Sequence, residues 1–153
     1  MAKKQIYLLD RIDRHLLTLL NDNSRVSLKE LAQHIGMSAP STTERLRKLE
    51  DAGVLLGYRV EIDPVVLGYG LTAIVRIRQL PGQLQKVEAL IREIPEFIEC
   101  DKVTGEDCFI ARLLLQDIGD LEPIMARISE YAETNTAIVK STPVKRRLPP
   151  LHQ

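Results

Sequence analysis

Residues 27–53 read SLKELAQHIGMSAPSTTERLRKLEDAG, and this stretch decides the fold of the first part of the chain. Ser27 and Glu30 are spaced as a capping box, in which each side chain bonds to the other residue's backbone amide where a helix begins. Gly36 stands where a left-handed residue ends that helix, and Ser38 follows as the N-cap of the next helix. A break this short does not reverse the chain, so the spacing predicts two helices that cross steeply.

Apolar residues at helical spacing extend the pattern on both sides of this break. They predict a first helix over residues 10–21, with Asp13 on its outward side. The helix after Ser38 is predicted to end near Gly53, with Leu46 and Leu49 facing inward. Its outward side carries hydroxyl side chains near the amino end and basic side chains one turn later. The candidate DNA-contacting residues on and beside that helix are Ser38, Pro40, Ser41, Thr43, Glu44, Arg45, Arg47 and Lys48.

This composition suits a recognition helix that enters the major groove of DNA. Ser and Thr hydroxyls bond to base edges, the Thr methyl contacts thymine, and Arg and Lys bind guanine or phosphate. Arg45 lies nearer the inward stripe, where it also braces the helix. The alternative that the periodicity leaves open is a solvated, charged helix of an ordinary helical domain.

The pattern changes after the helical part of the chain. Val54 to Ile62 read VLLGYRVEI, which predicts an extended strand, and residues 54–70 as a whole form the expected linker or hinge. A strand, helix, strand, strand, helix, strand order follows, and this order predicts a ferredoxin-like βαββαβ sandwich and an α+β fold class. The expected elements are 71–79, 83–94, 97–104, 108–116, a helix within 117–133, and 136–142. We therefore expect a helix-turn-helix domain over 1–53 and a ferredoxin-like domain over 71–153, and the resemblance described below implies that the second domain binds a ligand and forms the oligomer.

The formal net charge of the 153-residue chain is zero, but its charges are unevenly distributed. Residues 1–60 hold ten Lys and Arg against seven Asp and Glu, whereas residues 61–153 hold eleven against fourteen. This uneven distribution, with a basic first part and a slightly acidic second part, is expected when the basic part contacts phosphate. The sequence has no apolar run of about 18 residues and no signal-peptide pattern, so we expect a cytoplasmic, nucleoid-associated protein.

The sequence carries no motif typical of catalysis. It contains no nucleophile–base pair in one motif, no glycine-rich phosphate loop and no Cys/His metal spacing. We therefore expect no enzymatic activity, no cofactor and no metal. Two other classes stay open at this point. One is an enzyme or the regulatory subunit of one, because ferredoxin-like domains also sense amino acids on metabolic enzymes, and the other is a protein-interaction module.

The chain resembles, over nearly its whole length, the Lrp/AsnC (leucine-responsive, feast/famine) family of transcription regulators. The resemblance rests on LDRIDRHLLTLL at 9–20, LAQHIGMS at 31–38 and RLRKLEDAGVL at 45–55, in succession. It implies a winged-type helix-turn-helix joined to a ferredoxin-like effector domain. It also implies double-stranded DNA as a partner, homo-dimers that assemble further, often into octamers, and a small effector, usually an amino acid, bound between dimers.

The resemblance also implies an effector site at the turn between the second and third strands of the sandwich. The family pattern there is TG(D/E)-aromatic-D, and this chain has Thr104, Gly105, Glu106, Asp107 and Cys108. The last two depart from the pattern. Turn amides bind a carboxylate and acidic side chains bind an ammonium group, whereas the alternative is a plain hairpin turn with solvated acids. Thr134 and Thr136, at the start of the last strand, form the other expected side, although the family's Pro-Gly before that strand is absent.

Cys100 and Cys108 flank the same predicted hairpin. Their apolar strand neighbours and a reducing cytosol favour two unreactive thiols over a redox sensor. The basic tail at Lys145, Arg146 and Arg147 is either a further phosphate contact or a solvated chain end.

Overall fold

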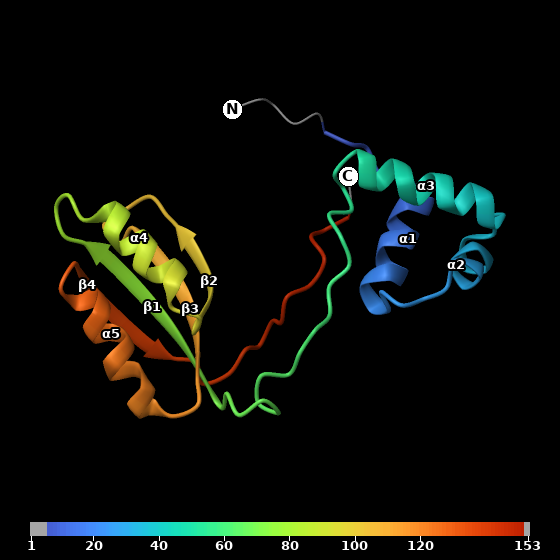
Figure 1. Ribbon diagram of the computed structural model, residues 1–153. Coiled ribbons are helices and arrows are strands. Elements are labelled where there is room, and N and C mark those ends of the chain that lie inside the picture. The colour runs from blue at the N-terminus through green and yellow to red at the C-terminus, as the bar shows by residue number, and fades with distance from the viewer. Residues whose placement is uncertain (1–5, 152–153) are drawn as a thin grey trace. The chain divides into compact units, whose positions relative to one another are not determined.

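The computed structural model describes residues 6–151, so the first five residues and the last two lie outside it. The described residues form two compact units, 6–61 with 144–151 and 62–143 (Figure 1). The end of the chain thus groups with the helical unit, whereas the sequence places it in a domain running over 71–153. Within the described residues, no helix is both long and apolar enough to cross a membrane.

Three helices make up the first unit: α1 (Arg11–Asp22), α2 (Leu28–Ile35) and α3 (Ala39–Asp51). The capping box of α2 is present, with the Ser27 amide donating to the Glu30 carboxylate at 2.9 Å. Gly36 ends α2 at φ +70°, a backbone conformation that glycine adopts without steric cost. Ser38 caps α3, as predicted. The core of this unit is formed by Leu16, Leu20 and Leu31, with Leu49 fully buried.

The prediction that Asp13 faces outward is wrong, because Asp13 is only 2% exposed. Asp10 and Asp13 form a capping box at the start of α1: the Asp13 amide donates to Asp10 at 2.8 Å, and the Asp10 amide donates to Asp13 at 3.2 Å. Helical periodicity does not predict such a box, because the box turns a polar side chain back toward the amino end of the helix.

The second unit is a four-stranded antiparallel sheet with two helices on one face. The strands are β1 (Leu71–Gln79), β2 (Phe97–Lys102), β3 (Phe109–Leu115) and β4 (Ala132–Ile138), in the order β2-β3-β1-β4. The helices are α4 (Leu84–Glu93) and α5 (Leu121–Ser129), which follows a short 3₁₀ turn at Ile118–Asp120. Figure 1 shows both helices on the same side of the sheet, and this confirms the ferredoxin-like βαββαβ order.

Strand β3 illustrates why the sheet has one buried and one open face. Every second residue of FIARLLL is buried, from Phe109 to Leu115, and these side chains pack against the helices. Ile77 on β1 and Ile128 on α5 belong to the same core and are 0% exposed. The opposite face has no covering layer within the described unit.

The structure differs from the sequence prediction in two elements. The last strand begins at Ala132 rather than at 136, because Ala132 pairs with Gln79 and continues the register set by Ala73 and Ile138. The segment 54–62 forms no strand, because residues 54–55 are bends, residues 56–62 are irregular, and the segment has no ladder partner in the described residues.

Candidate nucleic-acid interface and effector turn

The buried side chains of α3 define which side of the helix faces outward. Thr42 and Leu49 are 0% exposed, and Leu46 and Arg45 are half-buried, so the other positions of the helix are exposed. Of the eight candidate DNA-contacting residues, Arg45 alone is half-buried. The seven exposed candidates are Ser38, Pro40, Ser41, Thr43, Glu44, Arg47 and Lys48.

The hydroxyl groups at the start of α3 are already organised. The Ser38 hydroxyl donates to the Ser41 oxygen at 2.9 Å and accepts from the Ser41 amide at 3.3 Å. The Thr43 hydroxyl donates to the Ala39 carbonyl at 3.0 Å. The bond fixes the Thr43 rotamer, and the hydroxyl keeps its capacity to accept a hydrogen bond from a base.

The basic side chains of α3 are free to leave their present partners. Lys48 lies 3.0 Å from Glu44, and this bond lowers the pKa of the Glu44 carboxyl. Arg47 lies 3.9 Å from Asp51. The side chains of Arg47 and Lys48 are 74% and 63% exposed. Ion pairs this exposed contribute little to the free energy of folding, so a phosphate or a guanine can take the place of the carboxylate partners.

Arg45 is held inside the helical unit by two carboxylates from α1. Its Nη1 lies 2.8 Å from Asp13 and 2.5 Å from Asp10, and its side chain is 26% exposed. The two bonds raise the pKa of Arg45, while the Asp13 amide and then Arg45 lower the pKa of Asp10. Arg45 therefore fixes α3 against the start of α1, which is the bracing role expected from its place near the inward stripe.

The turn 104–108 is exposed at one end of the sheet. Thr104, Gly105 and Glu106 are exposed, while Asp107 and Cys108 are half-buried. Gly105 has φ +131°, so the backbone here needs glycine. The Cys108 amide donates to the Ile77 carbonyl at 2.9 Å, which fixes the end of the turn beside β1.

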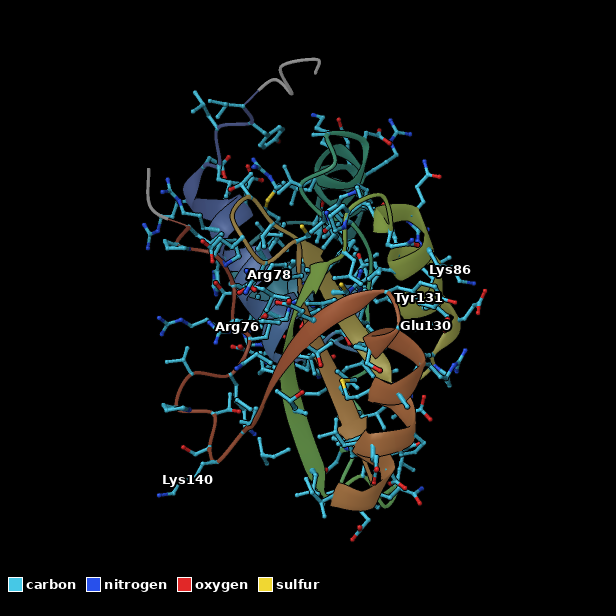
Figure 2. The ribbon with its side chains drawn as sticks, turned by 90° about the vertical axis from the view of Figure 1, so that its left-hand side faces the viewer. Arg76, Arg78, Lys86, Glu130, Tyr131 and Lys140 are labelled. Atoms are coloured by element: carbon cyan, nitrogen blue, oxygen red, sulfur yellow. The ribbon has the colours of Figure 1, made fainter. Side chains whose placement is uncertain are left out.

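Arg76 connects this turn to the last strand across the open face of the sheet. Its Nε lies 3.9 Å from Asp107, and its Nη2 donates to the Asn135 side chain at 3.1 Å. Arg78 pairs with Glu133 at 3.4 Å on the same face. Figure 2 shows Arg76 and Arg78 on one side of the sheet, and Lys86 and Tyr131 on the other side with the helices. Sequence reasoning missed Arg76, although the alternation of β1 places it on the polar face.

Within one chain, the turn and the two threonines do not form a closed site. Thr134 pairs with Ile77 and Thr136 with Val75, so both lie on β4, one strand beyond β1. Because Cys108 contacts β1 from the other side, about two strand spacings, or ~10 Å, separate the turn from Thr134. Thr136 faces the helix layer, where its hydroxyl lies 3.9 Å from the Met125 sulfur.

A cavity of about 440 Å³ lies at the opposite end of the same unit. Tyr69, Glu96, Asp120 and Arg127 are among its polar lining residues. Asp120 already accepts from the amides of Gln116 and Asp117, at 3.2 and 2.9 Å. This cavity is therefore a second concave surface to be controlled for in a binding experiment on the turn.

Cys100 is exposed and Cys108 is half-buried. Both are free, and burial raises the pKa of Cys100, which lowers its thiolate fraction. Within the described residues, no group of three His, Cys, Asp or Glu side chains is arranged to hold a metal ion.

Two family models match the chain, one for each unit. Residues 9–55 match a winged helix-turn-helix DNA-binding model, and residues 72–149 match a model described as the Lrp/AsnC ligand binding domain. Among curated proteins, the transcriptional regulator LrpC of Bacillus subtilis is 30% identical over 87% of this chain and 92% of its own. LrpA of Mycobacterium tuberculosis is 35% identical over 84% of this chain and 86% of its own.

Solved structures give the same result. The structure of B. subtilis LrpC has a TM-score of 0.84 at 29% identity, covering 90% of this chain and 99% of its own. A feast or famine regulatory protein from M. tuberculosis, solved in complex with L-methionine, has a TM-score of 0.82 at 33% identity. That comparison covers 92% of this chain and 98% of the other.

Proposed function

The chain belongs to the Lrp/AsnC family of helix-turn-helix transcription regulators, and from this we propose a function for each part of the chain. Residues 1–53 bind DNA, and residues 54–70 are the hinge. The domain that the sequence places at 71–153 binds the effector and holds the oligomer together, except that its last part, 144–151, groups with the helical unit. The protein is a sequence-specific DNA-binding regulator whose activity responds to a small effector, an amino acid. It acts as a regulator and not as an enzyme, on the nucleoid in the cytoplasm.

The outward surface of α3 carries the proposed DNA contact. Ser41 and Thr43 face base edges from the amino end of the helix, where a recognition helix meets the groove. Arg47 and Lys48 are the exposed cations of this surface and contact guanine or phosphate. Arg45 acts differently, because its guanidinium is committed to α1 and positions the helix.

A gel shift on the DNA upstream of the protein's own gene tests this assignment. The wild type should give a retarded band that weakens steeply with salt, while Arg47→Ala with Lys48→Ala should lose most of the binding. Lys86→Ala with Arg92→Ala is a matched control, since both side chains are exposed on α4 in the other unit. Unchanged binding by the α3 variant would refute the groove assignment.

We propose that the turn 104–108 forms the floor of the effector site and that a second chain completes it. The turn is exposed in the single chain and lies about 10 Å from Thr134, so one copy offers only part of a pocket. The amides around Gly105 suit a carboxylate, and Glu106 suits an ammonium group. Asp107 and Arg76 add charges where the family pattern has an aromatic ring, which favours a polar effector side chain.

Thermal-shift screening of the twenty amino acids tests the effector site. A stabilising amino acid should lose its effect in Glu106→Ala and in Asp107→Ala, and keep it in the control Glu122→Ala, which removes an exposed acid from α5. Loss in Arg127→Ala instead would move the site to the cavity at the opposite end of the sheet.

The open face of the sheet supports the proposed homo-oligomer. Ile74 and Leu114 are half-buried on this face and Ile110 is 38% exposed, with no layer covering them in the described unit. A second copy of this face buries these side chains and generates a two-fold dimer. Dimers that associate further, up to an octamer, would then carry several α3 helices to spaced DNA sites.

A further inference from the structure

The C-terminal tail, residues 144–151, returns to the DNA-binding unit instead of staying with the sheet that it follows. A groove of about 770 Å³ lies in this unit, lined by Leu17 and Leu20 of α1, by the linker 54–61 and by the tail itself. Figure 1 shows the end of the tail beside the chain that follows α3. The linker side of the groove is fixed to α3, because the Tyr58 hydroxyl donates to Glu50 at 3.1 Å.

Two leucines anchor the tail. Leu148 and Leu151 are half-buried, while Pro149 and Pro150 between them are exposed. Polyproline II backbone has three residues per turn, so positions three apart share one face, and proline fixes this conformation in advance. The Leu151 carbonyl accepts from Arg14 of α1 at 3.3 Å, which ties the anchor to the first helix.

The residues just before the anchor are a basic run. Lys145, Arg146 and Arg147 are all exposed, and within the described residues none of them forms an ion pair. Residues 1–61 hold ten basic against eight acidic residues, a formal net charge of +2. The tail adds three basic and no acidic residues, so the DNA-binding unit carries +5.

We propose that the tail is a basic arm that contacts DNA phosphates beside the α3 contact, held in place by Leu148 and Leu151. The arm rests on the proposed DNA binding by α3 and adds a sequence-independent contribution to it. Phosphate is the partner that matches three unpaired, exposed cations on a DNA-binding unit. The anchor keeps these cations close to the unit and so reduces the conformational entropy lost when DNA binds.

The salt dependence of DNA binding by the full chain tests the arm. Removing one cation that binds phosphate lowers the slope of log K against log salt by about 0.9, so Lys145→Ala with Arg146→Ala and Arg147→Ala should lower it by about 2.7. The decrease should be the same on specific and unrelated DNA. A control that removes Lys86, Arg92 and Arg127 from the other unit should keep the wild-type slope. An unchanged slope in the tail variant would overturn the proposal.

The anchor has a separate test that leaves the charges in place. Leu148→Ser with Leu151→Ser should weaken DNA binding at fixed salt while the slope stays near that of the wild type, and Val144→Ser, at a 62% exposed position, should change neither. Wild-type affinity in the leucine variant would refute the anchor. If the wild type itself fails to bind DNA, the proposed function fails, whereas wild-type affinity and slope in both tail variants overturn the arm alone.

Discussion

Replacing Arg45 with alanine should destabilise the DNA-binding unit far more than any other basic substitution on α3. The change removes the cation that pairs with Asp13, whose side chain is 3% exposed, and it also removes the cation that pairs with Asp10. A buried carboxylate that loses its counter-ion has no water to replace it. The helix α3 then loses its only polar tie to the start of α1 in the described residues.

The size of the effect follows from the burial of the three groups. Removing one partner of a fully buried pair costs about 3–5 kcal/mol. Arg45 is 26% exposed, Asp10 is 51% exposed, and Asp13 keeps the Asp10 amide at 3.2 Å, so solvent and this bond reduce the loss. We expect about 2 kcal/mol, which corresponds to about 8–16 °C in the melting temperature of a unit of this size. The matched variant Arg47→Ala, at a 74% exposed site, should change stability by about 0.5 kcal/mol or less.

Hydrogen exchange measured by mass spectrometry reports on the two units separately, so it can follow the stability of the helical unit alone. Peptides from α1 and α3 should exchange faster in Arg45→Ala, while peptides from β1 and β3 serve as an internal control. In a double-mutant cycle with Asp13→Asn, the coupling should be about 1–2 kcal/mol. The reasoning is refuted if Arg45→Ala behaves like Arg47→Ala or if the cycle shows no coupling.

Three further substitutions probe other parts of the fold. Gly36→Ala should cost about 1 kcal/mol in chemical denaturation, because its φ of +70° strains any residue with a Cβ even though the space there is open. Ile77→Ala, at 0% exposure, should destabilise the sheet unit by about 2–5 kcal/mol, a loss measured by urea unfolding. The pKa of Asp10 is lowered on folding, so its contribution is present above its unfolded pKa and is lost as the pH falls through the folded one. Asp10→Asn should therefore unfold with less acid dependence than the wild type, and an equal dependence would contradict this assignment.

The helical unit can be predicted closely because its signals are local. A capping box, a left-handed glycine and a hydroxyl cap each act within four residues, so Ser27, Gly36 and Ser38 mark the helix ends in the sequence itself. The outward surface of α3 then follows from the burial of Leu49. The pairing of Arg45 with Asp10 spans 35 positions, and no periodicity within one helix contains it.

The sheet shows the same division between local and long-range information. The sequence predicts strand β1 with its observed bounds, because its alternation is clear over nine residues. It predicts the start of β4 four residues too late, since the first residues of that strand, Ala132 to Asn135, are mostly polar and weakly alternating. Pairing with the end of β1 makes them a strand, and this pairing depends on a partner more than 50 positions away.

The candidate effector site is the least predictable part, and the reason lies in how it is built. Its floor, at Gly105 and Glu106, can be found in the sequence because it is a continuous turn. Arg76 cannot be found in that way, since it joins the turn to β4 only after the sheet has formed. Asp107 stands where the family pattern has an aromatic residue, and its carboxylate pairs with the Arg76 guanidinium at 3.9 Å. Arg76 and Asp107 form an ion pair between two elements that lie about 30 positions apart in the sequence, so no linear motif contains it.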